Sequence, residues 1–228
     1  MNPEQRKEAS ELQLHKRGIR INVQLHVIES DEEVSLRSRQ EVWQRLLALW
    51  AVASAAQARD CQPFRHYLEA HQLMSILSAR EQAFLCSLAP SEADYQEFSQ
   101  RSEALYFLAW CAGLTDKISV AATPSNLKNI LKQFPLSYPA TQEAPAAPAA
   151  PAAPDQLSAA LHLRSKSAIM DWSDLLYRLH WEVRHSQLTG RPCPASVNAS
   201  AVREWHQTAN WICQYEEEND WDLVSTET

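Results

Sequence analysis

The stretch "SRQEVWQRLLALWAVASAAQA" (residues 38–58) decides the fold class of this chain. Ser38 followed three residues later by Glu41 is a capping box, in which each side chain accepts the backbone N–H of the other residue. The run after it carries a wide apolar helical face and ends in alanines that allow close packing; the apolar face consists of Val42, Trp43, Leu46, Leu47, Leu49, Trp50 and Ala53. The stretch predicts a long helix packed among other helices.

The same signals recur along the chain. "SARE" (residues 78–81) and "SEAD" (residues 91–94) are capping boxes before apolar-periodic runs, and the second run continues to Gly113. Helices are also predicted at residues 3–17, ended by Gly18, at 173–188, ended by Gly190, and at 198–214. We therefore expect a mainly α protein, with an N-terminal helix over residues 1–18 and a single multi-helix domain over residues 19–228.

Two segments depart from this pattern. In "GIRINVQLHVI" (residues 18–28) apolar residues alternate, which predicts one short N-terminal strand. A lone strand needs a partner, so an oligomer formed through residues 19–27 is one hypothesis. In "SYPATQEAPAAPAAPAAPD" (residues 137–155) proline recurs every third residue. This composition favours a flexible Ala/Pro-rich insertion over residues 140–155, acting as a spacer rather than as a ligand for a proline-binding partner.

Composition restricts the class of function. The 228 residues are 45% hydrophobic, so the chain can bury a sizeable core. A net charge of −7 argues against a nucleic-acid binder and favours a basic partner. The N-terminus lacks the apolar core of a signal peptide and no uncharged run is long enough to span a bilayer, so we expect no membrane and a cytoplasmic location. Five cysteines without paired CxxC motifs disfavour zinc and disulfide frameworks.

Polar residues on the two C-terminal helices are the candidate site. Polar groups among tryptophans and leucines cost free energy unless they are hydrogen-bonded, so we expect them to satisfy one another, with Arg178 and Glu204 as a buried charged pair. The residues of this cluster are Arg178, His180, Glu204, His206 and Asn210. Four tryptophans are expected to pack around them, namely Trp110, Trp181, Trp211 and Trp221. The C-terminal "DWDLVSTET" (residues 220–228) is expected to fold back over this polar cluster.

Four blocks carry a resemblance to a known family. "RSEALYFLAWCAGL" (101–114), "LRSKSAIMDWSDLLYRLHWEVR" (163–184), "VREWHQTANW" (202–211) and "WDLVSTET" (221–228) resemble the bacterial family described as domain of unknown function 4272. The resemblance extends from about Arg17 to the C-terminus, with the Ala/Pro stretch as an insertion. Gln100 and Trp205 depart from the family pattern. The resemblance implies no activity, substrate or cofactor. The positions that follow the pattern are Arg101, Glu103, Trp110, Arg178, His180, Trp181, Glu204, His206, Asn210, Trp211, Trp221, Asp222 and Thr226.

Three classes of function follow from these observations. The first is a non-catalytic binding or adaptor protein, such as an antidote to a basic toxin, in which the acid run Glu216, Glu217 and Glu218 steers the basic partner. The second is an enzyme that uses His180 and His206 as acid and base, with Glu204 or Asp174 orienting them. The third is an oligomeric scaffold. Because no catalytic, metal-binding or phosphate-binding motif occurs, the sequence predicts no catalytic residue, metal ligand or cofactor.

Overall fold

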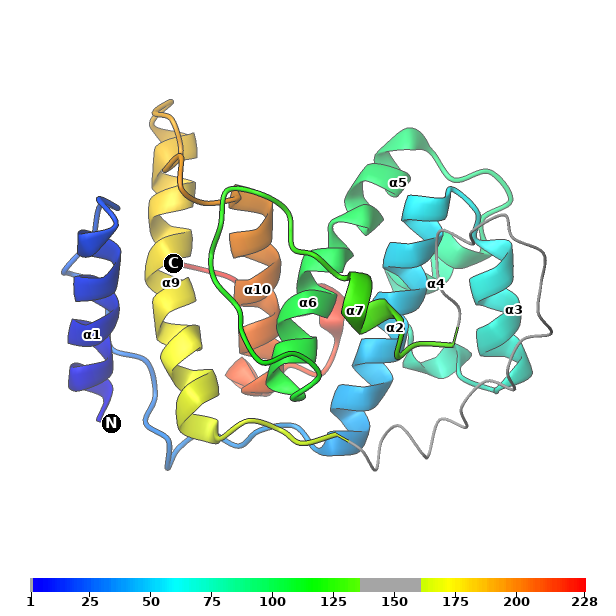
Figure 1. Ribbon diagram of the computed structural model, residues 1–228, viewed down its shortest axis with the longest axis horizontal. Helices are drawn as coiled ribbons and strands as arrows, with labels where there is room; N and C mark the ends of the chain where they lie inside the picture. Colours follow the sequence, from blue (N-terminus) through cyan, green and yellow to red (C-terminus); the bar gives the residue numbers. More distant parts are fainter. Residues whose placement is uncertain (1, 136–160) are drawn as a thin grey trace. The chain divides into compact units, whose positions relative to one another are not determined.

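The computed structural model describes residues 2–135 and 161–228, which form two compact units (Figure 1). Within the described residues, the first unit contains residues 2–37, 117–125 and 164–228, and the second contains residues 38–116, 126–135 and 161–163. Helices dominate both units, and no strand occurs within the described ranges, so the predicted mainly α fold is confirmed. The Ala/Pro insertion predicted over residues 140–155 lies outside the described residues. The single domain expected over residues 19–228 stays a prediction.

The second unit is assembled around α2 (Arg39–Ala58). Its capping box is formed as predicted, and nearly every residue from Val42 to Ala56 is buried. Trp50 is fully buried, with its ring 5.5 Å from that of Phe64 and 5.8 Å from that of Phe134. Helices on several sides cover α2 (Figure 1); the unit's other elements are α3 (Gln62–Ala70), η1 (Met74–Ile76), α4 (Ala79–Cys86), α5 (Glu92–Ser99), α6 (Arg101–Cys111) and α7 (Lys128–Leu131).

The other predicted capping boxes are also present. Ser78 and Ser91 accept the backbone N–H of Glu81 and Asp94 and begin α4 and α5. The helix expected to run on to Gly113 is divided at Gln100 into α5 and α6, and Gly113 follows the end of α6 with a φ of +76°. A left-handed φ of this kind is the conformation in which glycine ends helices without a steric penalty.

The first unit places α1 (Pro3–Lys16), α9 (Lys166–Leu188) and α10 (Ala199–Ile212) side by side, with α9 in the middle (Figure 1). Two 3₁₀ turns, η2 (Tyr215–Glu217) and η3 (Trp221–Leu223), follow α10. The predicted bounds of α1 and α10 agree with the structure within two residues, whereas α9 begins seven residues earlier than expected. Ser165 caps α9 by accepting the backbone N–H of Ala168.

The strand predicted over residues 19–27 is wrong for the described chain. Ile19 and Leu25 are buried, but Val23 is 56% exposed, so the alternation does not define one buried face. The backbone forms a turn in which Leu25 N–H donates to Asn22 O. Lys7 Nζ donates to the carbonyls of Val23 and Leu25, at 2.7 and 2.8 Å. A lysine from α1 therefore satisfies carbonyls that a neighbouring strand would otherwise bind.

Candidate functional site

Two buried arginines lie between α1 and α9. Arg178 is 1% exposed, and its Nε and Nη2 donate to the two carboxylate oxygens of Asp174 at 2.9 and 2.7 Å. Its Nη2 also donates to His26 O at 3.0 Å, and its Nη1 lies 3.6 Å from Glu11 Oε1. The partner expected from the sequence, Glu204, is absent from these contacts. Asp174 takes its place because a spacing of four on one helix already brings the two side chains together.

The second arginine, Arg6 of α1, is equally buried. Its Nη2 donates to Asp31 Oδ1 at 2.5 Å and its Nε to Asp171 Oδ1 at 2.9 Å. Lys166 Nζ donates to the carbonyls of Asp31 and Val34, both at 2.7 Å. Together with Arg178, these cations hold residues 26–35, which we call the wall segment. The wall segment is thus fixed to α1 and α9 by the ion pair of Arg6 with Asp31 and by hydrogen bonds from Lys166 and Arg178 to its carbonyl groups.

A chain of hydrogen bonds joins α9, α10 and the C-terminal residues. His180 Nδ1 lies 2.9 Å from His206 Nδ1, and His206 Nε2 lies 3.3 Å from Asn210 Nδ2. Asn210 Nδ2 also donates to Ser225 O at 2.8 Å. An amide nitrogen only donates, so His206 Nε2 accepts, and the proton of a neutral His206 lies on Nδ1 and is donated to His180 Nδ1. Three members of the predicted polar cluster therefore do satisfy one another.

His180 and His206 are both neutral at physiological pH. Burial lowers the pKa of His180 to about 4, and the nearby Arg184 and Arg203 lower it further in the same direction. Burial, with His180 and Arg184 as additional causes, lowers the pKa of His206 to about 3. An imidazole removed from water and placed beside cations loses its proton more easily. The pair therefore carries no positive charge at neutral pH.

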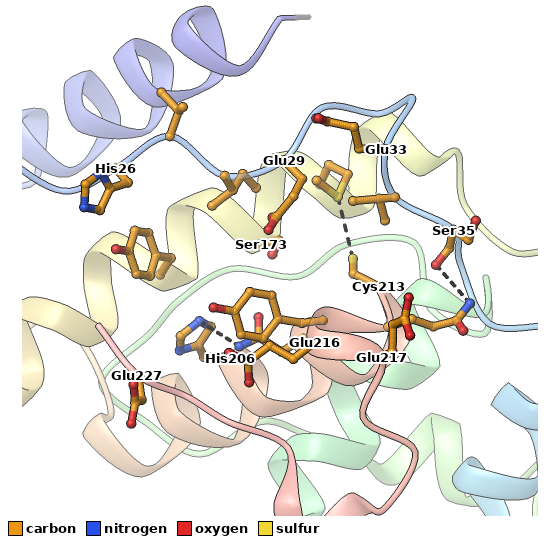
Figure 2. A pocket seen from close by; sticks show the side chains of 18 of the residues that line it. His26, Glu29, Glu33, Ser35, Ser173, His206, Cys213, Glu216, Glu217 and Glu227 are labelled. Atoms are coloured by element: carbon orange, nitrogen blue, oxygen red, sulfur yellow. Dashed lines mark hydrogen bonds between the residues drawn. The ribbon is translucent and has the colours of Figure 1, made fainter.

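His206 and Asn210 also line a pocket of about 910 Å³, which we call the acidic pocket (Figure 2). All of its lining residues belong to the first unit: the wall segment, α9, α10, the turn that follows α10 and the last two residues. Glu29 points from the wall segment towards Ser173 of α9 (Figure 2). No lysine or arginine is among the lining residues; the glutamates are Glu29, Glu33, Glu216, Glu217 and Glu227.

The carboxylates of this pocket make no ion pair with a described residue. Glu33 accepts the N–H and the hydroxyl of Ser30, which lowers its pKa. The other four glutamates of the pocket make no ion pair with any described residue. The pKa of Tyr215 is raised by burial and then by the proximity of Glu216, Glu29, Tyr177 and Glu227. These acidic groups are therefore close enough to one hydroxyl to act on it together.

The turn after α10 presents the glutamates in an unusual backbone conformation. Gln214, Glu216 and Glu217 have φ values of 54°, 56° and 56°, in the left-handed region that side chains other than glycine rarely adopt. Arg37 holds this turn: its Nη2 donates to Glu218 O at 2.5 Å and its Nη1 to Asn219 Oδ1 at 3.0 Å. The surrounding contacts therefore impose a backbone that the local sequence does not favour.

The structure separates the residues that the sequence grouped together. Glu204 is buried on α10, but Arg178 faces the seam with α1 and not the histidine pair. Of the acid run, Glu216 and Glu217 line the acidic pocket, whereas Glu218 does not and accepts the N–H of Asp220 at 2.7 Å.

The four tryptophans predicted to pack around the polar cluster lie in different parts of the structure. The ring centroids of Trp211 and Trp221 lie 5.9 Å apart, and Gln207 Nε2 donates to Trp221 O at 2.9 Å. The C-terminal residues therefore fold back onto α10 as expected. Trp181 is half-buried and stacks on His185, with ring centroids 4.8 Å apart. Trp110 belongs to α6 of the second unit, where its ring lies 5.8 Å from that of Phe107.

Sequence reasoning missed the wall segment because residues 19–27 suggested a strand that ran towards it. A signal was available in Ser30 and Glu33, which have the S-x-x-E spacing of a capping box, and the Glu33 carboxylate accepts the Ser30 N–H as in that motif. Tyr177 and Tyr215, which line the pocket, carried no signal, since single tyrosines are common on helices and turns.

Comparison with known proteins identifies one family. The family model described as "Domain of unknown function (DUF4272)" matches residues 6–224, so the similarity begins earlier than the expected Arg17. No curated protein and no solved structure matches the chain. Within the described residues, no three His, Cys, Asp or Glu side chains are placed to hold a metal ion, and no helix is long and apolar enough to cross a membrane.

Proposed function

Because the chain belongs to the DUF4272 family, whose description assigns no activity, we propose its function from the site: it is a non-catalytic binding protein whose acidic pocket holds a basic segment of a partner protein. The observation that carries this proposal is the set of glutamates without ion-pair partners among the described residues, in a pocket lined by no lysine or arginine. A basic toxin neutralised by this protein is one partner of that kind.

Charge complementarity supports the proposal. Like charges gathered in a partly enclosed space repel one another, and a cationic ligand relieves that repulsion. Glu29, Glu216, Glu217 and Glu227 come from three separate segments and line one pocket, so their negative charges add within it. The neutral His206 contributes no competing positive charge at physiological pH.

The contacts behind the pocket favour a site that is already formed before binding. Arg6, Lys166 and Arg178 fix the wall segment to α1 and α9, and Arg37 fixes the turn that carries Glu216 and Glu217. A fixed site loses less conformational entropy when it binds a ligand.

The enzyme alternative has weaker support. A general base needs a ring nitrogen that can reach the substrate. In His206 the Nδ1 donates to His180 and the Nε2 accepts from Asn210, so neither nitrogen is available. Arg178 is occupied by Asp174 and His26 and does not contact this pair.

A titration of a basic peptide tests the proposed function. The probe is a twelve-residue peptide of alternating serine and basic residues, with arginine and lysine in equal number, titrated calorimetrically at several salt concentrations. We expect binding that weakens as salt rises. The variant with Glu29→Gln, Glu216→Gln and Glu217→Gln should lose about tenfold in affinity.

A matched variant controls for net charge. Glu4, Glu8 and Glu69 are exposed and lie outside the pocket, so changing these three to glutamine removes the same charge. Its affinity should stay within about twofold of wild type, because exposed charges at a distance are screened. Absence of binding, or equal losses in the two triple variants, would refute a pocket-centred function.

A further inference from the structure

Tyr215 stands out among the residues of the acidic pocket. It is 37% exposed, and its ring makes no stacking or cation–π contact with any described residue. It lines the same pocket as Glu29, Glu216 and Glu227, and burial followed by these charges raises the pKa of its hydroxyl. An aromatic face beside several carboxylates is suited to a planar cation, because the face of the ring is electron-rich.

The same chain shows how such a set of side chains binds a guanidinium. In the second unit, Arg59 lies over the Tyr95 ring, with its Cζ 4.6 Å from the ring centroid. Its two terminal nitrogens donate to the two carboxylate oxygens of Glu92, at 3.2 and 2.6 Å. One tyrosine and one glutamate thus bind one arginine through its face and its edge. The acidic pocket is lined by two tyrosines, Tyr177 and Tyr215, and several glutamates but by no arginine.

On the basis of the proposed function, we propose that the acidic pocket recognises an arginine of the basic partner segment, with its guanidinium against the Tyr215 ring and its edge bound by Glu29 and Glu227. Arginine fits this chemistry better than lysine because its guanidinium is planar, weakly hydrated and able to bind a carboxylate through two parallel hydrogen bonds. An ammonium is a compact and strongly hydrated charge, and it loses more hydration on contact with a ring.

The size of the pocket agrees with an arginine presented within a peptide. At about 910 Å³ it is near the upper end of the roughly 300 to 1,000 Å³ range of small-ligand pockets. This space exceeds one side chain, so the residues next to the arginine also enter. The acidic lining that extends to Glu216 and Glu217 then contacts further basic residues of the segment.

Three capped nonapeptides test the choice of arginine. They share a serine and glycine framework and carry three central residues that are all arginine, all lysine, or all citrulline, the uncharged analogue of arginine. In calorimetric titrations against the full chain, the arginine peptide should bind about tenfold more tightly than the lysine peptide. The citrulline peptide should not bind measurably.

Two variants of one residue test the ring. Tyr215→Leu removes the aromatic face, so the preference for the arginine peptide over the lysine peptide should fall several-fold, and only the part that comes from hydrogen bonds to carboxylates should remain. Tyr215→Phe keeps the face and should keep the preference for arginine. Thermal unfolding of both variants verifies that they fold, and the phenylalanine variant keeps the test informative where the leucine variant is destabilised.

The outcomes separate this inference from the proposed function. Equal binding of the arginine and lysine peptides, lost in the Glu29→Gln, Glu216→Gln and Glu217→Gln variant, overturns the arginine preference and leaves a general site for basic segments. A preference for arginine that is undiminished in Tyr215→Leu overturns the role assigned to the ring. Failure of every basic peptide to bind overturns the proposed function itself.

Discussion

The wall segment has a paired charge where it contacts α1 and an unpaired carboxylate where it lines the acidic pocket. Where Arg6 and Arg178 hold the wall segment, each of these buried arginines binds carboxylates at hydrogen-bond distance. On the side of the acidic pocket, Glu29 makes no ion pair with the described residues. A buried charge is stable only when it is paired, whereas a charge that water reaches can remain alone. Paired charges therefore mark the structural side, and unpaired charges mark the side open to a ligand.

The largest expected effect comes from breaking the paired side. Arg178→Met leaves Asp174, which is 0% exposed, as a buried carboxylate without its partner. The free energy of unfolding should fall by about 3–5 kcal/mol, as measured by urea denaturation. Arg59→Met, which removes an exposed ion pair with Glu92 and a contact with the Tyr95 ring, serves as the control and should lower stability far less than Arg178→Met does.

A double-mutant cycle sharpens this prediction. Because Arg178 is bound by Asp174 and makes no contact with Glu204, the effects of Arg178→Met and Glu204→Gln on stability should add. A strong coupling between these two positions would show that the buried pair is the one first expected from the sequence and not the one described here.

A smaller effect is expected from the histidine pair that borders the pocket. The folded pKa values of His180 and His206, about 4 and about 3, lie below the value of about 6.5 for an unfolded histidine. The unfolded state then binds more protons below pH 6.5, so the stability that the pair contributes is complete above pH 6.5. It declines as pH falls towards 4, by at most about 1.4 kcal/mol per pH unit for each histidine.

Urea denaturation between pH 7.5 and 4.5 measures this decline. The variant with His180→Gln and His206→Gln should show a shallower dependence on pH than wild type, whatever its absolute stability. Nitrogen NMR of the wild type should also find the proton of His206 on Nδ1 at pH 7. Resonances of these two rings that titrate near pH 6.5 would contradict the neutral pair.

The smallest change in stability is expected on the unpaired side. Glu29→Gln and Glu227→Gln remove like charges from the pocket and break no ion pair with a described residue, so the melting temperature should stay the same or rise. Glu218→Gln is the comparison, because Glu218 accepts the backbone N–H of Asp220 and lies outside the lining. A marked loss of stability in Glu29→Gln would mean that this carboxylate has a structural role.

Local signals in the sequence predicted most of the helices. The three capping boxes and the glycines at positions 18, 113 and 190 fix helix ends through contacts within a few residues, and such contacts are visible in sequence. The alternation in residues 19–27 predicted a strand, but the backbone turns there, and Lys7, twelve or more residues away, binds its carbonyl groups. No local pattern encodes that contact.

The candidate site was predicted only in part for the same reason. His206 and Asn210 share one helical face, and their hydrogen bond follows from the spacing of four. The pocket that they line depends on three segments brought together by tertiary contacts, including a turn with left-handed residues. Glu216 and Glu217 could be selected from the sequence as a charged run, but Glu29 and Tyr215 could be joined to them only in the folded chain.

The contact between Ala112 and His162 bears on how the chain accommodates changes in length. His162 N–H donates to Ala112 O at 3.2 Å, and a side chain at Gly113 would place a Cβ only 2.5 Å from His162 O. The polypeptide thus leaves this point after α6 and returns to it before α9. Closing a loop costs only about 0.6 kcal/mol more for each doubling of its length. The chain between these two points includes residues 117–125 and α7, and outside these parts it can gain or lose residues at small cost, as long as position 113 keeps its glycine and the ends still meet.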